Sequence, residues 1–358
     1  MKNLFFALLT LIFSASAFGS TGKNPPFKGP EPRQPARLDP ELAGQWHLQQ
    51  LKLPELWRQF GEGSPSITVG VVDSGIEYNH PEIRANVKIK ESEVRRDGID
   101  NDGNGFIDDL IGWDFVKEEN LPLDRAGHGM MMATIIAGVK NNGFGGSGMC
   151  PSCTILSARF INHEGLGDDE DAVRGIKYAV GEKVSVLNLS FAGEGRDASL
   201  ARALRLAEDA DVLVVTSAGN DGEDINHEEI YPAGYNYDNM LTVAAVDPQG
   251  KLIESSNFGD RVVHLGVPGE EIQGVWLGEW DKGSGTSNAA AVMSGAAALL
   301  RSYAPGLKAP QLKQIFLATA KRKSWLAGKL VSGGLLDLEA AVRCARTPGL
   351  TCLRGRAR

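Results

Sequence analysis

The chain has 358 residues, 43 of them glycine, and hydrophobic residues make up 42% of it, which is enough for a large core. Asp and Glu outnumber Lys and Arg by 45 to 37, and no face rich in Lys and Arg is interleaved with aromatic residues, so we expect no nucleic-acid partner. No linker and no internal repeat divides the sequence. We therefore expect one large α/β domain, present as a monomer.

The N-terminus has the three zones of a secretory signal peptide in residues 1–17. Lys2 precedes an uncharged apolar run from Leu4 to Phe13, and small residues follow at Ala15 to Ala17. The apolar run is too short to span a bilayer as a mature helix. We predict cleavage after Ala17, with neighbouring small residues as alternative sites. The protein should be exported, to a periplasm or outside the cell, and free of the membrane once the signal is removed.

A polar arm precedes the folded part of the chain. Residues 18–40 are rich in Pro, Gly, Lys and Arg, which is typical of a disordered arm or a short pro-segment. The folded domain is expected over residues 41–345, and residues 346–358 form a C-terminal tail. Its first clear strand, residues 67–72, is almost wholly apolar, as in a strand covered on both faces, and ends at Asp73. Open α/β sheets bind ligands at this carboxyl edge.

A loop at residues 97–109 is dense in oxygen ligands. Its Asp100, Asp102 and Asn104 alternate as in an EF-hand, but the twelfth position of that template is Ile111 instead of Glu, so an EF-hand is not supported. We expect calcium to be held by several of its side chains, and an acidic surface turn is the alternative. The candidate ligands are Asp97, Asp100, Asp102, Asn104, Asp108 and Asp109.

Strands and helices alternate through the rest of the chain, which predicts a parallel sheet with right-handed crossovers. Two polar residues stand at element ends: His128, between two glycines at the start of a helix, and Asn220, after a strand. The expected strands span residues 155–160, 184–189, 212–216, 241–246 and 262–267, and the expected helices 130–137, 169–180, 199–209, 309–319 and 336–343.

Ser287 stands in a run of glycine and other small residues, 283–291, at or near the start of a buried helix. Free backbone N–H groups and the helix dipole favour negative charge there, although a helix-capping serine is the commoner use of such a position. Together with His128, Asp73 and Asn220, Ser287 completes the set of groups that acyl transfer requires. These groups are a hydroxyl nucleophile, a base, a carboxylate that orients the base, and an amide donor for the oxyanion.

These motifs resemble those of the subtilisin-like serine proteases, or subtilases, from about residue 39 to residue 342. Asp, His and Ser come in the order that subtilisin uses. The resemblance implies a three-layer α/β sandwich with a mostly parallel central sheet and helices on both faces. It also implies a secreted serine endopeptidase that hydrolyses polypeptides. The matching blocks are Val71–Ile76, Asn79–Glu82, Gly127–Gly129, Leu189–Gly193, Ser217–Asn220, Tyr231–Ala233, Ser256–Gly259, Val267–Gly269 and Gly285–Ala290.

The resemblance also implies a role for each residue. Ser287 attacks the scissile carbonyl, His128 takes and returns the proton, and Asp73 orients the imidazole. Asn220 and the backbone N–H of Ser287 stabilise the oxyanion. The segments that would bind an extended substrate by strand addition are Ser190, Phe191 and Ala192 on one side and Ala218 and Gly219 on the other.

Several positions depart from the usual subtilase pattern. Met130, Thr134, Ala192, Asn288 and Ala291 replace a threonine, two glycines, a methionine and a proline that the family commonly has. None removes a catalytic group, so we expect activity. A catalytically impaired, peptide-binding protein of the same fold is the alternative. Only about twenty residues lie between the signal and the domain, too few for a folded pro-domain, so we expect unaided folding, with calcium, or a helper in trans.

Four cysteines are expected to form disulfides in an exported protein. We favour the local pairs Cys150 with Cys153 and Cys344 with Cys352, because each surrounds a turn, although other pairings are possible. A zinc site is excluded by the spacing of the second pair.

Overall fold

The structure is a computed structural model that describes residues 24–30, 36–227 and 230–353. The predicted signal peptide lies outside these residues. In the described part of the chain, no helix combines the length and the apolar character that crossing a membrane requires.

A nine-stranded sheet runs through the molecule in the order β12-β13-β9-β8-β6-β4-β1-β3-β2. All neighbouring strands are parallel except β12 and β13. The strands are β1 Thr68–Asp73, β2 Gly112–Asp114, β3 Thr154–Arg159, β4 Val186–Leu189, β6 Leu213–Ser217, β8 Met240–Val246, β9 Leu265–Pro268, β12 Lys321–Arg322 and β13 Gly334–Leu335.

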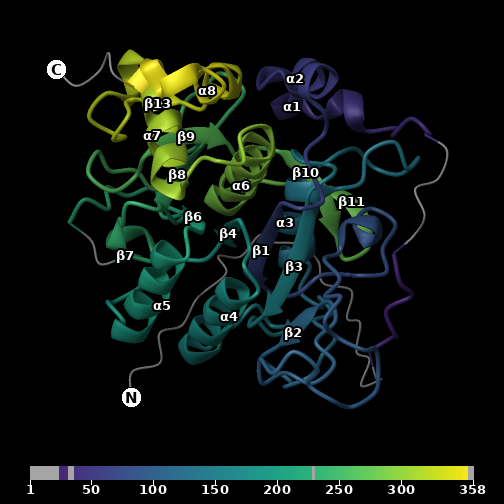
Figure 1. Cartoon of the computed structure of the whole chain (residues 1–358). Helices are drawn as coiled ribbons and strands as arrows, with labels where there is room; N and C mark the ends of the chain where they lie inside the picture. The colour runs from purple at the N-terminus through teal and green to yellow at the C-terminus, as the bar shows by residue number, and fades with distance from the viewer. Residues whose placement is uncertain (1–23, 31–35, 228–229, 354–358) are drawn as a thin grey trace.

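Helices cover both faces of this sheet, which confirms the expected three-layer architecture (Figure 1). Strand β1 is buried along its whole length. Its Val69 and Val71 belong to the core shared with α3, α6, α7 and α8, and Val72 belongs to the core shared with α4 and α5. The helices are α1 Trp46–Gln50, α2 Leu53–Phe60, α3 His128–Ala137, α4 Asp169–Gly181, α5 Ala198–Asp209, α6 Thr286–Tyr303, α7 Ala309–Thr319 and α8 Leu338–Ala345, with short 3-10 helices at Leu42–Gly44, Arg84–Asn86, Ala233–Tyr235, Ser324–Leu326 and Pro348–Leu353.

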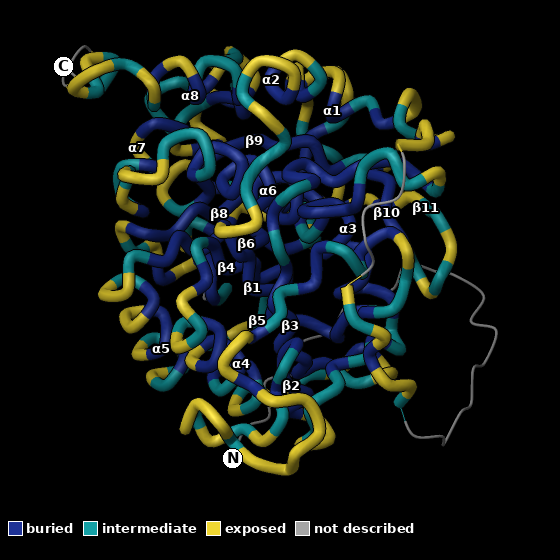
Figure 2. The backbone as a smooth tube through the Cα atoms, turned by 45° about the vertical axis from the view of Figure 1, so that its right-hand side comes forward, coloured by how far each residue is buried: buried dark blue, intermediate teal, exposed yellow. Residues whose placement is uncertain are grey.

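Helix α6 lies at the centre of the molecule. Every residue from Asn288 to Arg301 is buried, and the small side chains of Ala289–Ala291 and Ala296–Ala298 let neighbouring elements approach closely. Figure 2 shows α6 and the strands beside it in the colour of buried residues, inside an exposed rim that includes parts of α2 and α5. The start of α6 is therefore fixed by packing along most of the helix.

Several short elements were not predicted. Two antiparallel strand pairs lie outside the main sheet, β5 (Gly193–Glu194) with β7 (Ile230–Tyr231) and the hairpin of β10 (Ile272–Trp276) with β11 (Glu279–Gly283). Strands β5 and β7 have only two residues each, too few for a recognisable pattern. The apolar run at 262–267 also begins before the strand, since β9 starts only at Leu265.

Residues 24–30, part of the predicted arm, lie extended along the body. Phe27 is only 3% exposed and its ring meets that of Tyr78 edge to face, 6.1 Å between centroids. The Tyr78 hydroxyl donates to the Pro25 carbonyl at 2.6 Å, and Arg125 donates to the Asn24 side chain at 2.7 Å. This strap joins the segment that follows β1 to the segment that precedes α3.

Both local disulfides are present, as favoured from the sequence. Cys150 pairs with Cys153 just beyond α3, and Cys344 pairs with Cys352. The second bridge ties the 3-10 helix Pro348–Leu353 to α8.

We predict that Phe27→Ala lowers the free energy of unfolding by about 2 kcal/mol. This is less than the cost for a fully enclosed phenylalanine, because the strap can detach as a unit. Leu38→Ala is the matched control, since Leu38 lies on the same arm but is 88% exposed. Chemical denaturation measures both. Equal stability of the two variants would mean that the strap does not contribute to the fold.

Candidate active site

Asp73 and His128 meet at the carboxyl edge of the sheet. Asp73 is the last residue of β1, and His128 is the first residue of α3. The imidazole Nδ1 lies 2.8 Å and 2.9 Å from the two carboxylate oxygens of Asp73, and both side chains are buried. A carboxylate that binds Nδ1 fixes the tautomer, so Nε2 is free to take up a proton.

A glycine makes this approach possible. A Cβ atom on Gly129 would lie 2.3 Å from the carbonyl oxygen of Gly75, so no other residue fits there. The Gly129 N–H donates to the Ser74 hydroxyl at 2.8 Å. The first turn of α3 is thus held directly against the end of β1.

Asp124 organises the turn that leads into α3 and was not predicted from the sequence. Its buried carboxylate accepts hydrogen bonds from the N–H groups of Ala126 at 2.8 Å, Gly127 at 2.9 Å and Met130 at 2.8 Å. These are donors that the start of a helix otherwise leaves unpaired. An acidic residue four positions before a histidine at a helix start was the available signal.

Two carboxylates act on the pKa of His128. Burial of the ring favours its neutral form, but the charge and hydrogen bond of Asp73 and the charge of Asp124 outweigh it, so the pKa of His128 is raised above its usual 6.5. The folded chain therefore retains this proton to higher pH than the unfolded chain does. The stability contributed by the protonated pair is complete below the usual pKa and is lost as pH rises through the raised one.

Ser287 is the second residue of α6 and is partly buried. Its hydroxyl donates to the Ser190 carbonyl at 3.0 Å, and the Ser190 hydroxyl donates back to the Ser287 carbonyl at 3.1 Å. No hydrogen bond joins Ser287 to His128 in the described residues. Before the helix, Gly285 adopts φ 148°, a conformation that side chains disfavour, and brings the chain against Asn220.

Asn220 is held by the residue before Ser287. Its Oδ1 accepts from the Thr286 N–H at 2.8 Å and from the Thr286 hydroxyl at 3.0 Å. Because a backbone N–H can only donate, the accepting atom must be the oxygen, which leaves the Nδ2 amide free to donate. The Thr286 hydroxyl also accepts from the Gly219 N–H at 3.2 Å, so the strand end and the helix start are joined.

The expected substrate-binding segments differ in which side chains and backbone groups remain available to bind a substrate. Phe191 is buried against Phe160 with 5.0 Å between ring centroids, so only its backbone can face a substrate. The carbonyls of Ala218 and Gly219 accept from the side-chain amide and the backbone N–H of Asn257. Ala192 is partly buried beside β5.

Three of the unusual residues make contacts that join α3 to its neighbours. The Thr134 hydroxyl accepts from the Val275 N–H on β10 at 3.0 Å. The Asn288 amide, next to Ser287, approaches the Met131 sulfur at 3.6 Å, and the Glu77 N–H approaches the Met130 sulfur at 3.4 Å.

The acidic loop 97–109 is organised largely around Lys90. The buried ammonium lies 2.7 Å from Asp109, 2.8 Å from Asp102 and 2.9 Å from Glu182. Asp100 accepts from three backbone N–H groups of the loop, and Asp108 accepts from those of Asp97 and Gly98. The six predicted ligands thus do not converge on a single point. Two of them, Asp102 and Asp109, instead form ion pairs with Lys90, which precedes the loop in the sequence.

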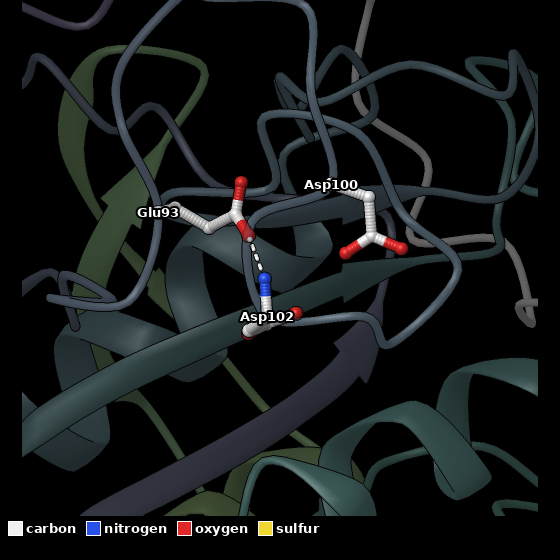
Figure 3. A group of neighbouring side chains, drawn as sticks. All are labelled: Glu93, Asp100 and Asp102. Atoms are coloured by element: carbon white, nitrogen blue, oxygen red, sulfur yellow. Dashed lines mark hydrogen bonds between the residues drawn. The ribbon is translucent and has the colours of Figure 1, made fainter.

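Three oxygen donors do converge beside this loop. Glu93, Asp100 and Asp102 each place a carboxylate oxygen within 4.8 Å of the others (Figure 3). One Glu93 oxygen accepts from the N–H groups of Asn101 and Asp102, whereas the other is buried without a hydrogen-bond partner in the described residues. Glu93 lies before the predicted segment and was missed.

A second acidic pair, Asp39 and Glu82, was also missed because its members are far apart in the sequence. Asp39 accepts from the N–H groups of residues 141–143, and Glu82 accepts from the Asn142 amide at 2.8 Å. Burial, and then the charge of Asp39, raises the pKa of Glu82 to about 9. Since the folded chain then binds the additional proton, this group makes stability fall as pH rises from about 4.5 to about 9.

A carboxylate, an imidazole, a hydroxyl and an amide gather at one edge of a parallel sheet, which places the chain in the class of α/β proteins with a serine-hydrolase type of site. More narrowly, the chain belongs to the Subtilase family, which it matches over residues 64–336.

Known relatives agree with this assignment. Thermitase of Thermoactinomyces vulgaris is 30% identical over 80% of this chain and 93% of its own length. Subtilisin-like protease 1 of Plasmodium berghei (strain Anka) is 28% identical over 84% of this chain, which spans about half (54%) of that relative. The crystal structure of a lanthipeptide protease superposes with a TM-score of 0.69 at 20% identity, covering 85% of this chain and 95% of that one, and shows the shared fold.

We predict that Asp124→Asn lowers the pKa of His128, because the variant removes a negative charge that favours the imidazolium form. It should also cost about 1 to 2 kcal/mol of stability, since one acceptor of backbone N–H groups is lost. Asp337→Asn is the matched control, because Asp337 likewise accepts from a helix N-terminus, that of α8. NMR titration of the histidine rings measures the pKa. An unchanged pKa in Asp124→Asn would contradict the influence assigned to Asp124.

Proposed function

We propose that this protein is an exported serine endopeptidase that hydrolyses peptide bonds in polypeptides. The observation that carries this proposal is the contact of Asp73 with His128 Nδ1, at the start of a helix that packs on α6, whose second residue is Ser287. Membership of the subtilase family supports the reaction. Export is supported by the N-terminal sequence pattern and by the two disulfides.

In this proposal Ser287 Oγ attacks the scissile carbonyl carbon while His128 Nε2 takes its proton. The tetrahedral species collapses, the C–N bond breaks, and His128 returns the proton to the leaving amine. Water then attacks the acyl-enzyme with the same base and releases the acid. Asp73 stays ionised throughout and stabilises the imidazolium form of His128.

The oxyanion of the tetrahedral species would accept hydrogen bonds from Asn220 Nδ2 and from the Ser287 N–H. Asn220 suits this role because Thr286 holds its carbonyl oxygen and so aims its amide. Such donors act strongly because they are already oriented before charge develops.

Binding of an extended substrate would also release the nucleophile. The Ser190 carbonyl, which accepts from the Ser287 hydroxyl in this structure, is an acceptor of the kind that strand addition requires. A substrate N–H that donates to this carbonyl would compete with Ser287. The hydroxyl would then be free to turn to His128.

A second function is favoured by two observations. Ser287 makes no hydrogen bond to His128 in the described residues, and its neighbour Asn288 is unusual for the family. A catalytically impaired protein that binds peptides on the same surface is consistent with both. Covalent labelling by a fluorophosphonate probe separates the two functions, since only an activated serine reacts.

For calcium, the donor set of Glu93, Asp100 and Asp102 fits a hard cation, because it offers only carboxylate oxygens and one of them is buried without a partner. We propose that these residues hold calcium and that the ion stabilises the loop 97–109. The remaining predicted ligands, Asp97, Asn104, Asp108 and Asp109, would support this loop through their hydrogen bonds and the Lys90 ion pair.

We predict that the wild-type protein reacts with a fluorophosphonate probe and cleaves casein, and that Ser287→Ala abolishes both. Asn220→Ala should retain labelling and lose about 100- to 1,000-fold in rate, a range measured for the corresponding change in subtilisin. Mass spectrometry and a cleavage assay measure these results. A folded wild-type chain that is not labelled would favour the peptide-binding alternative. Cleavage by Ser287→Ala at the wild-type level would exclude Ser287 as the nucleophile.

We predict that a chelator lowers the melting temperature and that added calcium restores it. An ion that binds only the folded state stabilises it by about 3 kcal/mol at one hundred times its dissociation constant. Glu93→Gln should weaken this response, and Glu164→Gln, an exposed acid outside the loop, is the control. A full response in Glu93→Gln would place the ion elsewhere, and no response in the wild type would exclude calcium.

A further inference from the structure

The turn between β10 and β11 has an unexpected residue. Trp276 pairs with Glu279, so the loop consists of Leu277 and Gly278 alone. Both have positive φ, 46° and 83°, the pattern of a type I′ turn, for which Asn, Asp and Gly are preferred. Leucine is disfavoured in this left-handed conformation, and its side chain is 48% exposed. Neither backbone preference nor burial therefore explains why leucine stands here.

This turn lies beside the catalytic histidine. A Cβ atom on Gly127, the residue before His128, would be 2.9 Å from the Trp276 ring and 3.1 Å from Leu277 Cγ. His80 Nε2 lies 3.3 Å from the Gly278 carbonyl oxygen, which holds the turn on its other side. The Thr134 hydroxyl fixes β10 to α3 through the Val275 N–H. The tip of the hairpin is therefore held in place next to His128.

The chemistry of the site indicates which part of a substrate would meet this tip. In the proposed reaction the acyl half would lie along Ser190 to Ala192, with its carbonyl oxygen at Asn220. His128 gives its proton to the leaving amine, so the peptide beyond the scissile bond starts at His128. Because Leu277 packs on the residue before His128, it borders the leaving-group side of the bond.

We propose that Leu277 determines specificity on the leaving-group side of the scissile bond, by favouring substrates with a large apolar side chain there. This inference rests on the proposed endopeptidase function. An apolar side chain that covers Leu277 removes the apolar surfaces of both from water, which favours binding. The indole of Trp276, partly exposed beside it, extends the same surface. Strained residues retained at a functional site are a recurrent feature of proteins, and Leu277 fits that description.

The test uses the full-length chain and a library of peptides with a constant acyl half and three varied residues after the scissile bond. Cleavage is mapped by mass spectrometry, and rates are normalised to active enzyme titrated with the fluorophosphonate probe. The variants are Leu277→Ser and Leu277→Asn. Leu206→Ser on α5 is the matched control, since Leu206 is 47% exposed but is not a neighbour of His128.

We expect the wild type and Leu206→Ser to prefer Leu, Phe or Met over Ser or Asp by about tenfold at one varied position, and both Leu277 variants to reduce this ratio to about twofold. Leu277→Asn should also raise the melting temperature by about 2 °C, because Asn-Gly suits the turn. A wild type without this preference, or Leu277 variants that keep it, would overturn the inference. So would a lower melting temperature of Leu277→Asn, since Leu277 would then be retained for packing.

The same experiment distinguishes this inference from the proposed function. Peptides that are cleaved with no apolar preference after the scissile bond leave the endopeptidase function intact and overturn only the role of Leu277. A wild-type protein that cleaves no peptide and is not labelled by the probe overturns both.

Discussion

The hydrogen bond of His128 to Asp73 is the constraint on which the site depends, because it joins the end of the central strand to the start of a helix. Each partner is held by elements that tolerate little movement. Strand β1 is buried on both faces, and α3 can reach it only because Gly129 carries no side chain. The charge of Asp73 and its hydrogen bond favour the protonated ring of His128, so the same contact sets both the position and the pKa of His128.

The segment that follows β1 and the segment that precedes α3 are held together by residues that take no part in the proposed reaction. Asp124 holds the backbone turn before His128, and Arg125 next to it binds Asn24 of the N-terminal strap. The same strap packs Phe27 on Tyr78, just after β1. A single extended segment thus spans the two loops that place Asp73 and His128. This explains why a polar, Pro-rich arm has ordered contacts with the domain.

Long periodic segments and local motifs made most of the fold predictable from sequence. The run of α4 and the buried strands β1, β3, β4 and β6 were anticipated within a few residues, since burial on both faces produces continuous apolar runs. What could not be predicted depends on contacts between distant residues. Lys90 meets Asp109 and Glu182, and Asp39 lies with Glu82, through the fold alone. The β10–β11 hairpin was missed for a local reason, since Leu277-Gly278 is not a recognised turn sequence.

Three of the residues that depart from the family pattern, Met130, Thr134 and Asn288, make contacts between α3 and its neighbours. Met130 and Met131 are on the first turn of α3, Thr134 is one turn later, and Asn288 follows Ser287 on α6. Thr134 binds β10, the strand that leads to Leu277, and Asn288 contacts Met131, so these residues connect α3 with the hairpin and with α6. Helix α3, which begins at His128, is therefore joined by direct contacts to α6, which carries Ser287, and to β10, which leads to the hairpin tip.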